Sequence, residues 1–227
     1  DLVIGTFGRS FWVLDDIRPL RELAAEGVNE LEKAIKAFDS PDAYLANWRQ
    51  AMGSRFAADA MYSGDNRPRG AMISYSVNKE LAKKSEKSDS PAVSGRSWGR
   101  RGSDEEKVKV AIFDESGENI RNFEVTPEHN GVNRMQWGLE RKGMERPSRR
   151  AARPNMPEPR GGDVLPGTYK VVMSYAGSKD STMVTVHYDP RIEITMEALE
   201  ATAALEDAAG ALGAELAKAV SSLVTAE

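Results

Sequence analysis

Cysteine is absent from this chain of 227 residues, and histidine occurs only as His129 and His187. The absence of cysteine excludes disulfide bonds, thiolate zinc ligands and a cysteine nucleophile. The two histidines lack the i, i+4 spacing of a helical zinc pair, so we expect both to be structural or solvated. The sequence therefore predicts no metal site.

Positive charge is not in excess, and long apolar runs are missing. The chain has 31 Lys and Arg against 35 Asp and Glu, which gives a net charge of −4. The basic footprint that is typical of nucleic-acid-binding domains is therefore lacking. No apolar run reaches the roughly 18–20 residues that cross a bilayer. We expect neither a nucleic-acid partner nor a membrane span.

Residues with catalytic or ligand-binding chemistry are few. Neither a P-loop nor a dinucleotide-binding glycine motif precedes a helix. Asp15 and Asp16 could suggest a glycosidase, but neighbours on a strand point to opposite faces, so we interpret them as a helix cap. Asp65 and Asn66 supply fewer oxygens than the roughly 6–8 that calcium takes, and they indicate a turn. We expect no catalytic residue and no cofactor.

The N-terminal region predicts a β-hairpin followed by helices. Two β-prone runs, 2–6 and 11–15, flank a turn that contains Gly8, and Trp12 of the second run is expected in a core. Because an isolated hairpin is marginal in water, it should belong to a larger sheet. Residues 19–38 have helical spacing with a break at Gly27, and residues 43–62 are expected to be irregular.

Six further runs have the composition and spacing of strands. Turns and loops separate them, which predicts an antiparallel sandwich with Trp137 and Tyr169 inside. The first run should have one mostly polar face, which carries Ser74 and Ser76. The runs are 71–77, 107–113, 119–125, 132–139, 168–175 and 181–188.

Two long polar segments, 79–106 and 141–162, interrupt these strands. Their composition favours mobile loops. Trp98 of the first segment could stack on a sugar or a protein partner, or fold back onto the sandwich. The second segment could contact an anionic glycan or the acidic face of a partner, or could simply be solvated. Its candidate binding residues are Arg146, Arg149 and Arg150.

The C-terminal region predicts a long amphipathic helix. Thr195 is a good N-cap, and leucines recur at spacings of three and four up to residue 224. Gly210 and Gly213 should weaken this helix. Its apolar stripe needs a partner, which is either the sandwich or another helix beyond Glu227.

Three stretches resemble a known family. Residues 1–17, with Gly5-Thr6-Phe7-Gly8-Arg9-Ser10, look like the end of the β-propeller in bacterial BNR-repeat, sortilin-N-terminal-like proteins, often labelled glycosyl-hydrolase-like. Gly64-Asp65-Asn66 and the run 71–77 fit the entry into the family's C-terminal β-sandwich. The runs 131–137 and 165–171 are similar to the paired motifs of the FlgD-type immunoglobulin-like sandwich. Phe7 departs from the family's histidine, which argues against a required side-chain role there.

The resemblance implies a mainly β chain with four parts. They are the end of a β-propeller (1–17), a helical or irregular linker (18–63), an antiparallel immunoglobulin-like β-sandwich (64–192) and a C-terminal helix (193–227). It also implies an upstream β-propeller in the same polypeptide and an extracytoplasmic location: periplasmic, outer-surface or secreted. We expect a non-catalytic structural or interaction module that contacts a glycan or a protein. The alternative is an accessory domain of a glycan-acting hydrolase whose active site lies in the upstream propeller.

Overall fold

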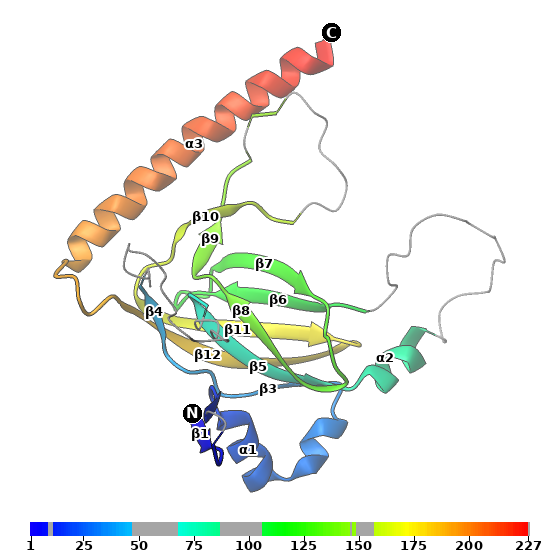
Figure 1. Ribbon diagram of the computed structural model, residues 1–227. Helices are drawn as coiled ribbons and strands as arrows, with labels where there is room; N and C mark the ends of the chain where they lie inside the picture. Colours follow the sequence, from blue (N-terminus) through cyan, green and yellow to red (C-terminus); the bar gives the residue numbers. More distant parts are fainter. Residues whose placement is uncertain (9–10, 47–67, 87–105, 146, 149–156, 227) are drawn as a thin grey trace.

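The computed structural model describes residues 1–8, 11–46, 68–86, 106–145, 147–148 and 157–226. Strands outnumber helices, so the chain is mainly β, as the sequence predicts. A sheet of five strands has the order β4-β12-β11-β6-β7, and a sheet of three has the order β3-β5-β8 (Figure 1). One continuous cluster of buried side chains includes residues of both sheets, so they share a single core.

The two sheets are antiparallel except where β4 pairs with β12 in parallel. Their strands are β3 (Ile35–Ala37), β4 (Ala43–Leu45), β5 (Ala71–Val77), β6 (Val108–Phe113), β7 (Asn119–Val125), β8 (Gly131–Trp137), β11 (Gly167–Tyr175) and β12 (Ser178–Tyr188).

The predicted inward residues are in this core. Trp137 and Tyr169 are 1% and 7% exposed, and Met135 and Leu139 are buried on the same side as Trp137. Arg134 and Gln136 lie on the other, exposed face of β8. The two-residue period of β8, β11 and β6 is therefore confirmed, because one face of each strand packs on the core and the other does not.

Two short strands lie where the sequence predicted other structure. Residues 35–38 were expected to be helical, but β3 pairs with β5 there, and Phe38 N–H donates to the Ser74 carbonyl at 3.1 Å. Strand β4 lies at 43–45, where an irregular segment was expected. Tertiary pairing has overridden the local pattern at both places.

The predicted polar face of β5, which carries Ser74 and Ser76, is buried, because all seven residues of this strand are buried. β5 is the central strand of its sheet. The Oγ atoms of Ser74 and Ser76 are buried and have no hydrogen-bond partner among the described residues. Arg134, which lies opposite Ser74 on β8, reaches the backbone carbonyl of Asp15, so the chain after the N-terminal hairpin lies over this face.

The N-terminal hairpin is formed by β1 (Leu2–Gly5) and β2 (Phe11–Leu14). It is followed by α1 (Arg18–Glu26) and by a short 3-10 helix, η1 (Val28–Glu32). Gly27 separates the two helices with φ of +101°, a conformation that favours glycine, as the predicted break requires. The expectation that Trp12 is in a core is wrong for the core of this chain, because this side chain is 67% exposed.

The described residues of the two polar segments contain regular structure. Helix α2 (Lys79–Glu86) begins the first, and β9 (Glu140–Lys142) pairs with β10 (Arg160–Asp163) across the second. Arg121 of β7 is 5% exposed and fastens this small hairpin, because its Nη1 donates to the carbonyls of Arg141 and Pro159, each at 3.1 Å.

Helix α3 (Met196–Ala226) is continuous, and its predicted N-cap is confirmed because Ala198 N–H donates to Thr195 Oγ1 at 3.3 Å. The helix runs past β10 and extends away from the strands (Figure 1).

Candidate functional site

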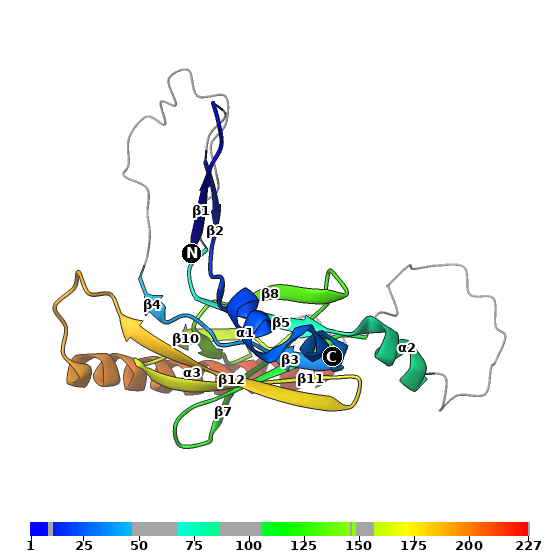
Figure 2. The same cartoon turned by 90° about the horizontal axis from the view of Figure 1, so that it is seen from below.

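The hairpin β1-β2 exposes apolar side chains on both of its faces. Leu2 lies beside Leu14, and Ile4 beside Trp12. The exposed fractions of the seven residues other than Gly5 run from 41% for Leu14 to 71% for Phe11. Figure 2 shows the hairpin standing away from the two sheets.

This pattern is unusual for a ribbon in water. Successive side chains on a strand point to opposite faces, so a hairpin with one covered face has polar residues at every second position. Strands that are apolar at nearly every position are typical of sheets buried on both faces. Both outer edges of the hairpin also present backbone N–H and C=O groups that can pair with further strands. The hairpin therefore has the chemistry of a segment that is enclosed by other β-structure.

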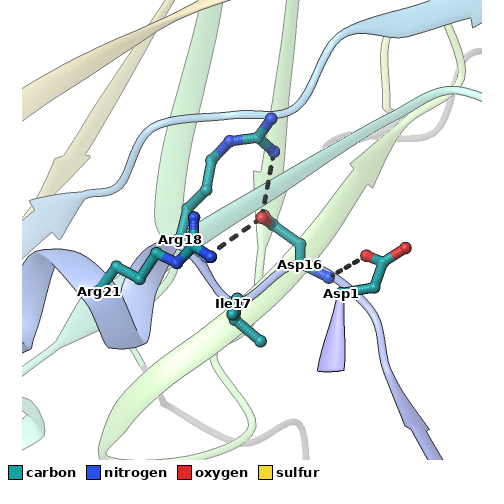
Figure 3. A pocket seen from close by; sticks show the side chains of 5 residues that line it. All are labelled: Asp1, Asp16, Ile17, Arg18 and Arg21. Atoms are coloured by element: carbon teal, nitrogen blue, oxygen red, sulfur yellow. Dashed lines mark hydrogen bonds and ion pairs between the residues drawn. The ribbon is translucent and has the colours of Figure 1, made fainter. Parts of the chain in front are cut away.

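The base of the hairpin is fixed by Asp16, whose φ of +54° is uncommon for a residue other than glycine. Its Oδ1 accepts hydrogen bonds from the Arg18 backbone N–H at 3.3 Å and from Arg18 Nη1 at 3.1 Å (Figure 3). Its own N–H donates to Asp1 Oδ1 at 2.8 Å. The interpretation of Asp15 and Asp16 as a helix cap is wrong, because the N-cap of α1 is Ile17 and α1 has no side-chain cap hydrogen bond. Asp16 instead lies one residue before the cap and fixes the turn into the helix.

Arg134 joins this base to the body of the molecule. Its Nη2 donates to the carbonyl of Asp15 at 2.7 Å and to that of Asp16 at 3.3 Å. The turn from β2 into α1 is therefore held against β8, whereas the strands of the hairpin remain exposed.

A cavity of about 190 Å³ lies at the same junction, lined by Asp1, Asp16, Ile17, Arg18 and Arg21 (Figure 3). Asp16 Oδ2 is buried there without a hydrogen-bond partner in the described part of the chain. The lining residues include no serine, threonine, cysteine or histidine, so they do not form a nucleophile and base pair.

A second cavity, of about 320 Å³, lies between the β6-β7 loop and the start of β11. The carboxylates that line it accept hydrogen bonds from neighbouring residues of the same loops. The hydrogen bond from Ser116 lowers the pKa of Asp114, and Glu115 Oε1 accepts from the Thr168 N–H at 3.0 Å. We therefore interpret this cavity as part of the loop packing.

The two histidines do not meet. His187 Nε2 lies 3.0 Å from Asp42 Oδ2, and its ring packs on Tyr44 with centroids 5.2 Å apart, so it supports the pairing of β4 with β12. His129 lies in an exposed loop, 3.8 Å from Glu128. Among the residues that the structure describes, no group of three or more His, Asp or Glu side chains could hold a metal ion.

The candidate binding residues lie outside the described residues. These are Trp98, Arg146, Arg149 and Arg150, together with the turn residues Asp65 and Asn66. The same holds for 95–99, a Gly-x-Ser-x-Gly sequence that the expectation of no catalytic residue did not consider. The sequence analysis did not identify the exposed hairpin as a surface, because apolar alternation does not reveal whether a partner covers it.

Helices in the described ranges are too short or too polar to cross a bilayer. Comparisons of the chain with protein-family models, with curated proteins and with solved structures find no match.

Proposed function

We propose that this chain is a non-catalytic structural and interaction module whose hairpin β1-β2 completes a larger β-structure upstream, the β-propeller that residues 1–17 resemble. The observation that carries this proposal is the exposure of apolar residues on both faces of the hairpin. Burying about 100 Å² of apolar surface contributes roughly 2.5 kcal/mol, so enclosing Phe11, Trp12 and their neighbours would stabilise the assembly substantially.

We further propose that the body is an immunoglobulin-like sandwich. If β3, β5, β6, β8, β11 and β12 are named A, B, C, E, F and G, the smaller sheet has the order A-B-E and the larger contains G-F-C. The Tyr169 hydroxyl donates to the Leu165 carbonyl at 2.6 Å, which resembles the tyrosine corner that precedes strand F in such domains. On this proposal the sandwich begins near Ile35 and ends near Asp189.

A test of the module compares the chain 1–227 with a longer protein that includes the residues upstream of it. Hydrogen–deuterium exchange should be fast for the amides of 2–5 and 11–14 in the chain alone and strongly slowed in the longer protein. Equal exchange rates in the two proteins would contradict the proposal.

A pair of substitutions sharpens this test. Val13→Asp should destabilise the longer protein by about 2 kcal/mol or more, because a carboxylate would be buried there, yet change the chain 1–227 by less than about 0.5 kcal/mol. Val28→Asp, at a position on η1 that is 70% exposed, introduces the same charge and should be near neutral in both proteins.

The glycan-hydrolase alternative assigns catalysis to the upstream propeller and an accessory role to this chain. Under either proposal the protein is extracytoplasmic, and a glycan or an acidic protein surface would meet Trp98, Arg146, Arg149 and Arg150. An assay of the chain 1–227 on a panel of glycans should detect binding at most. Turnover by the chain alone would contradict a non-catalytic module.

A further inference from the structure

Helix α3 carries a regular apolar seam that faces solvent. The helix has 31 residues and is therefore about 46 Å long at 1.5 Å per residue. Six seam residues recur at alternating spacings of four and three, and all are exposed, with the leucines between 57% and 72%. The seam consists of Leu205, Ala209, Leu212, Leu216, Ala219 and Leu223. This spacing is the a and d pattern of a coiled coil.

The seam is not the face of α3 that meets the body. Arg141 Nη1 lies 3.0 Å from Asp207 Oδ2, and Met144 packs so close to Gly210 that an added Cβ would lie 3.1 Å from its Cγ. At about 100° per residue, Asp207 and Gly210 are roughly 200° and 140° around the helix from Leu205. The body of the same chain therefore leaves the seam open.

The seam has the same residues in the same order from either end. Its centre is residue 214, and Leu212 and Leu216 lie at equal distances from it. The same is true of Ala209 and Ala219, and of the outer two leucines. Two antiparallel copies of α3 would place leucine opposite leucine and alanine opposite alanine. A twofold interface requires this kind of self-complementarity.

Charge favours the antiparallel orientation. The first part of α3 carries four acids and no base, whereas Glu215 and Lys218 cancel in the remainder. Parallel pairing would bring two acidic halves together. Antiparallel pairing places Glu206 and Asp207 against a half without net charge and leaves Glu197 and Glu200 beyond the end of the partner helix. It also aligns the helix dipoles favourably. The four acids are Glu197, Glu200, Glu206 and Asp207.

The seam gives a contact of modest size. In this register residues 202–226 of the two helices overlap, and a strip about 37 Å long and 10–12 Å wide covers roughly 400 Å² on each helix. Two such strips give about 800 Å², which is the size of a small protein interface. We infer that α3 pairs with α3 of a second copy of this chain as an antiparallel two-stranded coiled coil.

Sedimentation equilibrium of the chain 1–227 should give twice its mass of 24.9 kDa. The double variant Leu212→Glu/Leu216→Glu should raise the dissociation constant at least about 100-fold, because it buries carboxylates in the central layers. Ala211→Glu adds one glutamate at an exposed position about 120° from the seam and should remain dimeric. Circular dichroism should show that both variants keep their folded body.

A monomeric parent chain would overturn the inference, and so would a dimer that the double variant leaves intact. Association that Val13→Asp abolishes and the double variant does not would assign self-association to the hairpin instead. The dimer does not depend on the upstream β-structure, so this test can fail while the proposed module stands.

The absence of cysteine allows a direct test of orientation. Ala209→Cys and Ala219→Cys chains should form a disulfide-linked dimer when mixed and oxidised, because these positions face each other in the antiparallel pair. Each variant alone should stay uncrosslinked. Crosslinking of each variant with itself would indicate parallel helices and overturn the proposal, as would no crosslink in any mixture.

Discussion

The ring of Trp137 meets the ring of Tyr169 edge to face, with centroids 5.4 Å apart and planes at 71°. Trp137 belongs to β8 and Tyr169 to β11, so this contact joins the two sheets at the core. The indole Nε1–H also donates to the Glu140 carbonyl at 3.1 Å, so its polar atom is satisfied.

Trp137→Ala should lower the free energy of unfolding by about 3–5 kcal/mol, because it leaves a cavity between the sheets. Urea titration followed by circular dichroism measures the change. Trp12→Ala removes the same side chain from an exposed site and should change the value by less than about 0.5 kcal/mol. Equal losses of unfolding free energy in the two variants would show that Trp137 does not join the sheets.

Tyr169→Phe should lower the free energy of unfolding by about 1–2 kcal/mol, because the Leu165 carbonyl loses its hydrogen-bond donor while the ring packing remains. Tyr44→Phe, on the half-exposed strand β4, is the matched control and should be near neutral in urea titration. A neutral Tyr169→Phe variant would contradict a structural role for this bond and would weaken the proposed tyrosine corner.

Burial raises the pKa of Tyr169 to about 12, well above the value of about 10 expected in the unfolded chain. The folded state therefore holds this proton more tightly. The resulting stability is fully present below about pH 10 and is lost as the pH rises through 12. Subtracting the phenolate absorbance of Tyr169→Phe from that of the parent chain should leave a single titration near pH 12. A midpoint near 10 would mean that the hydroxyl is solvated.

Hydrogen bonds from the Arg191 side chain and backbone lower the pKa of Asp189 to about 2. Its unfolded value is about 3.9, so the stabilisation exists above that pH and is lost as the pH falls through 2. Asp189→Asn should be less stable than the parent chain at pH 7, and the difference should narrow between pH 4 and 2. Asp39→Asn controls for the loss of a surface carboxylate. A difference that does not change with pH would contradict the ion pair.

Gly70→Ala should destabilise the chain by more than about 2 kcal/mol. Gly70 has φ of +113°, and an added Cβ would lie 2.2 Å from the Trp137 carbonyl oxygen, so neither backbone can tolerate it. Gly213→Ala meets no neighbouring atom and should instead stabilise helix α3 by up to about 1 kcal/mol. Thermal unfolding should show a lower melting temperature for Gly70→Ala and a higher one for Gly213→Ala. A Gly70→Ala variant with unchanged stability would contradict the close approach of Gly70 to the Trp137 carbonyl.

The sequence predicts the long strands well because their own residues carry the pattern. Alternation along β11 and β12 is enough to locate them and to place Tyr169 inside. The three-residue strands β3 and β4 are too short for any period, and only their partners β5 and β12 determine them. Ser74 and Ser76 look like solvent-facing residues, yet the central position of β5 and the segment held by Arg134 bury them.

The exposed hairpin of the candidate site could not be predicted from the sequence either. Alternation indicates a strand at Trp12, but it cannot show whether a partner is needed to cover that strand. Only the structure shows that Trp12 and Phe11 are exposed, and that the base of their hairpin is fixed by Asp16.

Figures 1 and 2 place the hairpin β1-β2 and helix α3 on opposite sides of the body. A protein bound to one surface therefore would not obstruct the other. Two copies joined through α3 would present two hairpins at separate points. Each body would act as the spacer between its hairpin and the helix pair. A dimer would therefore link two of the larger β-structures that bind the hairpins. The avidity of the dimer for them would depend on how rigidly the sandwich holds each hairpin relative to α3.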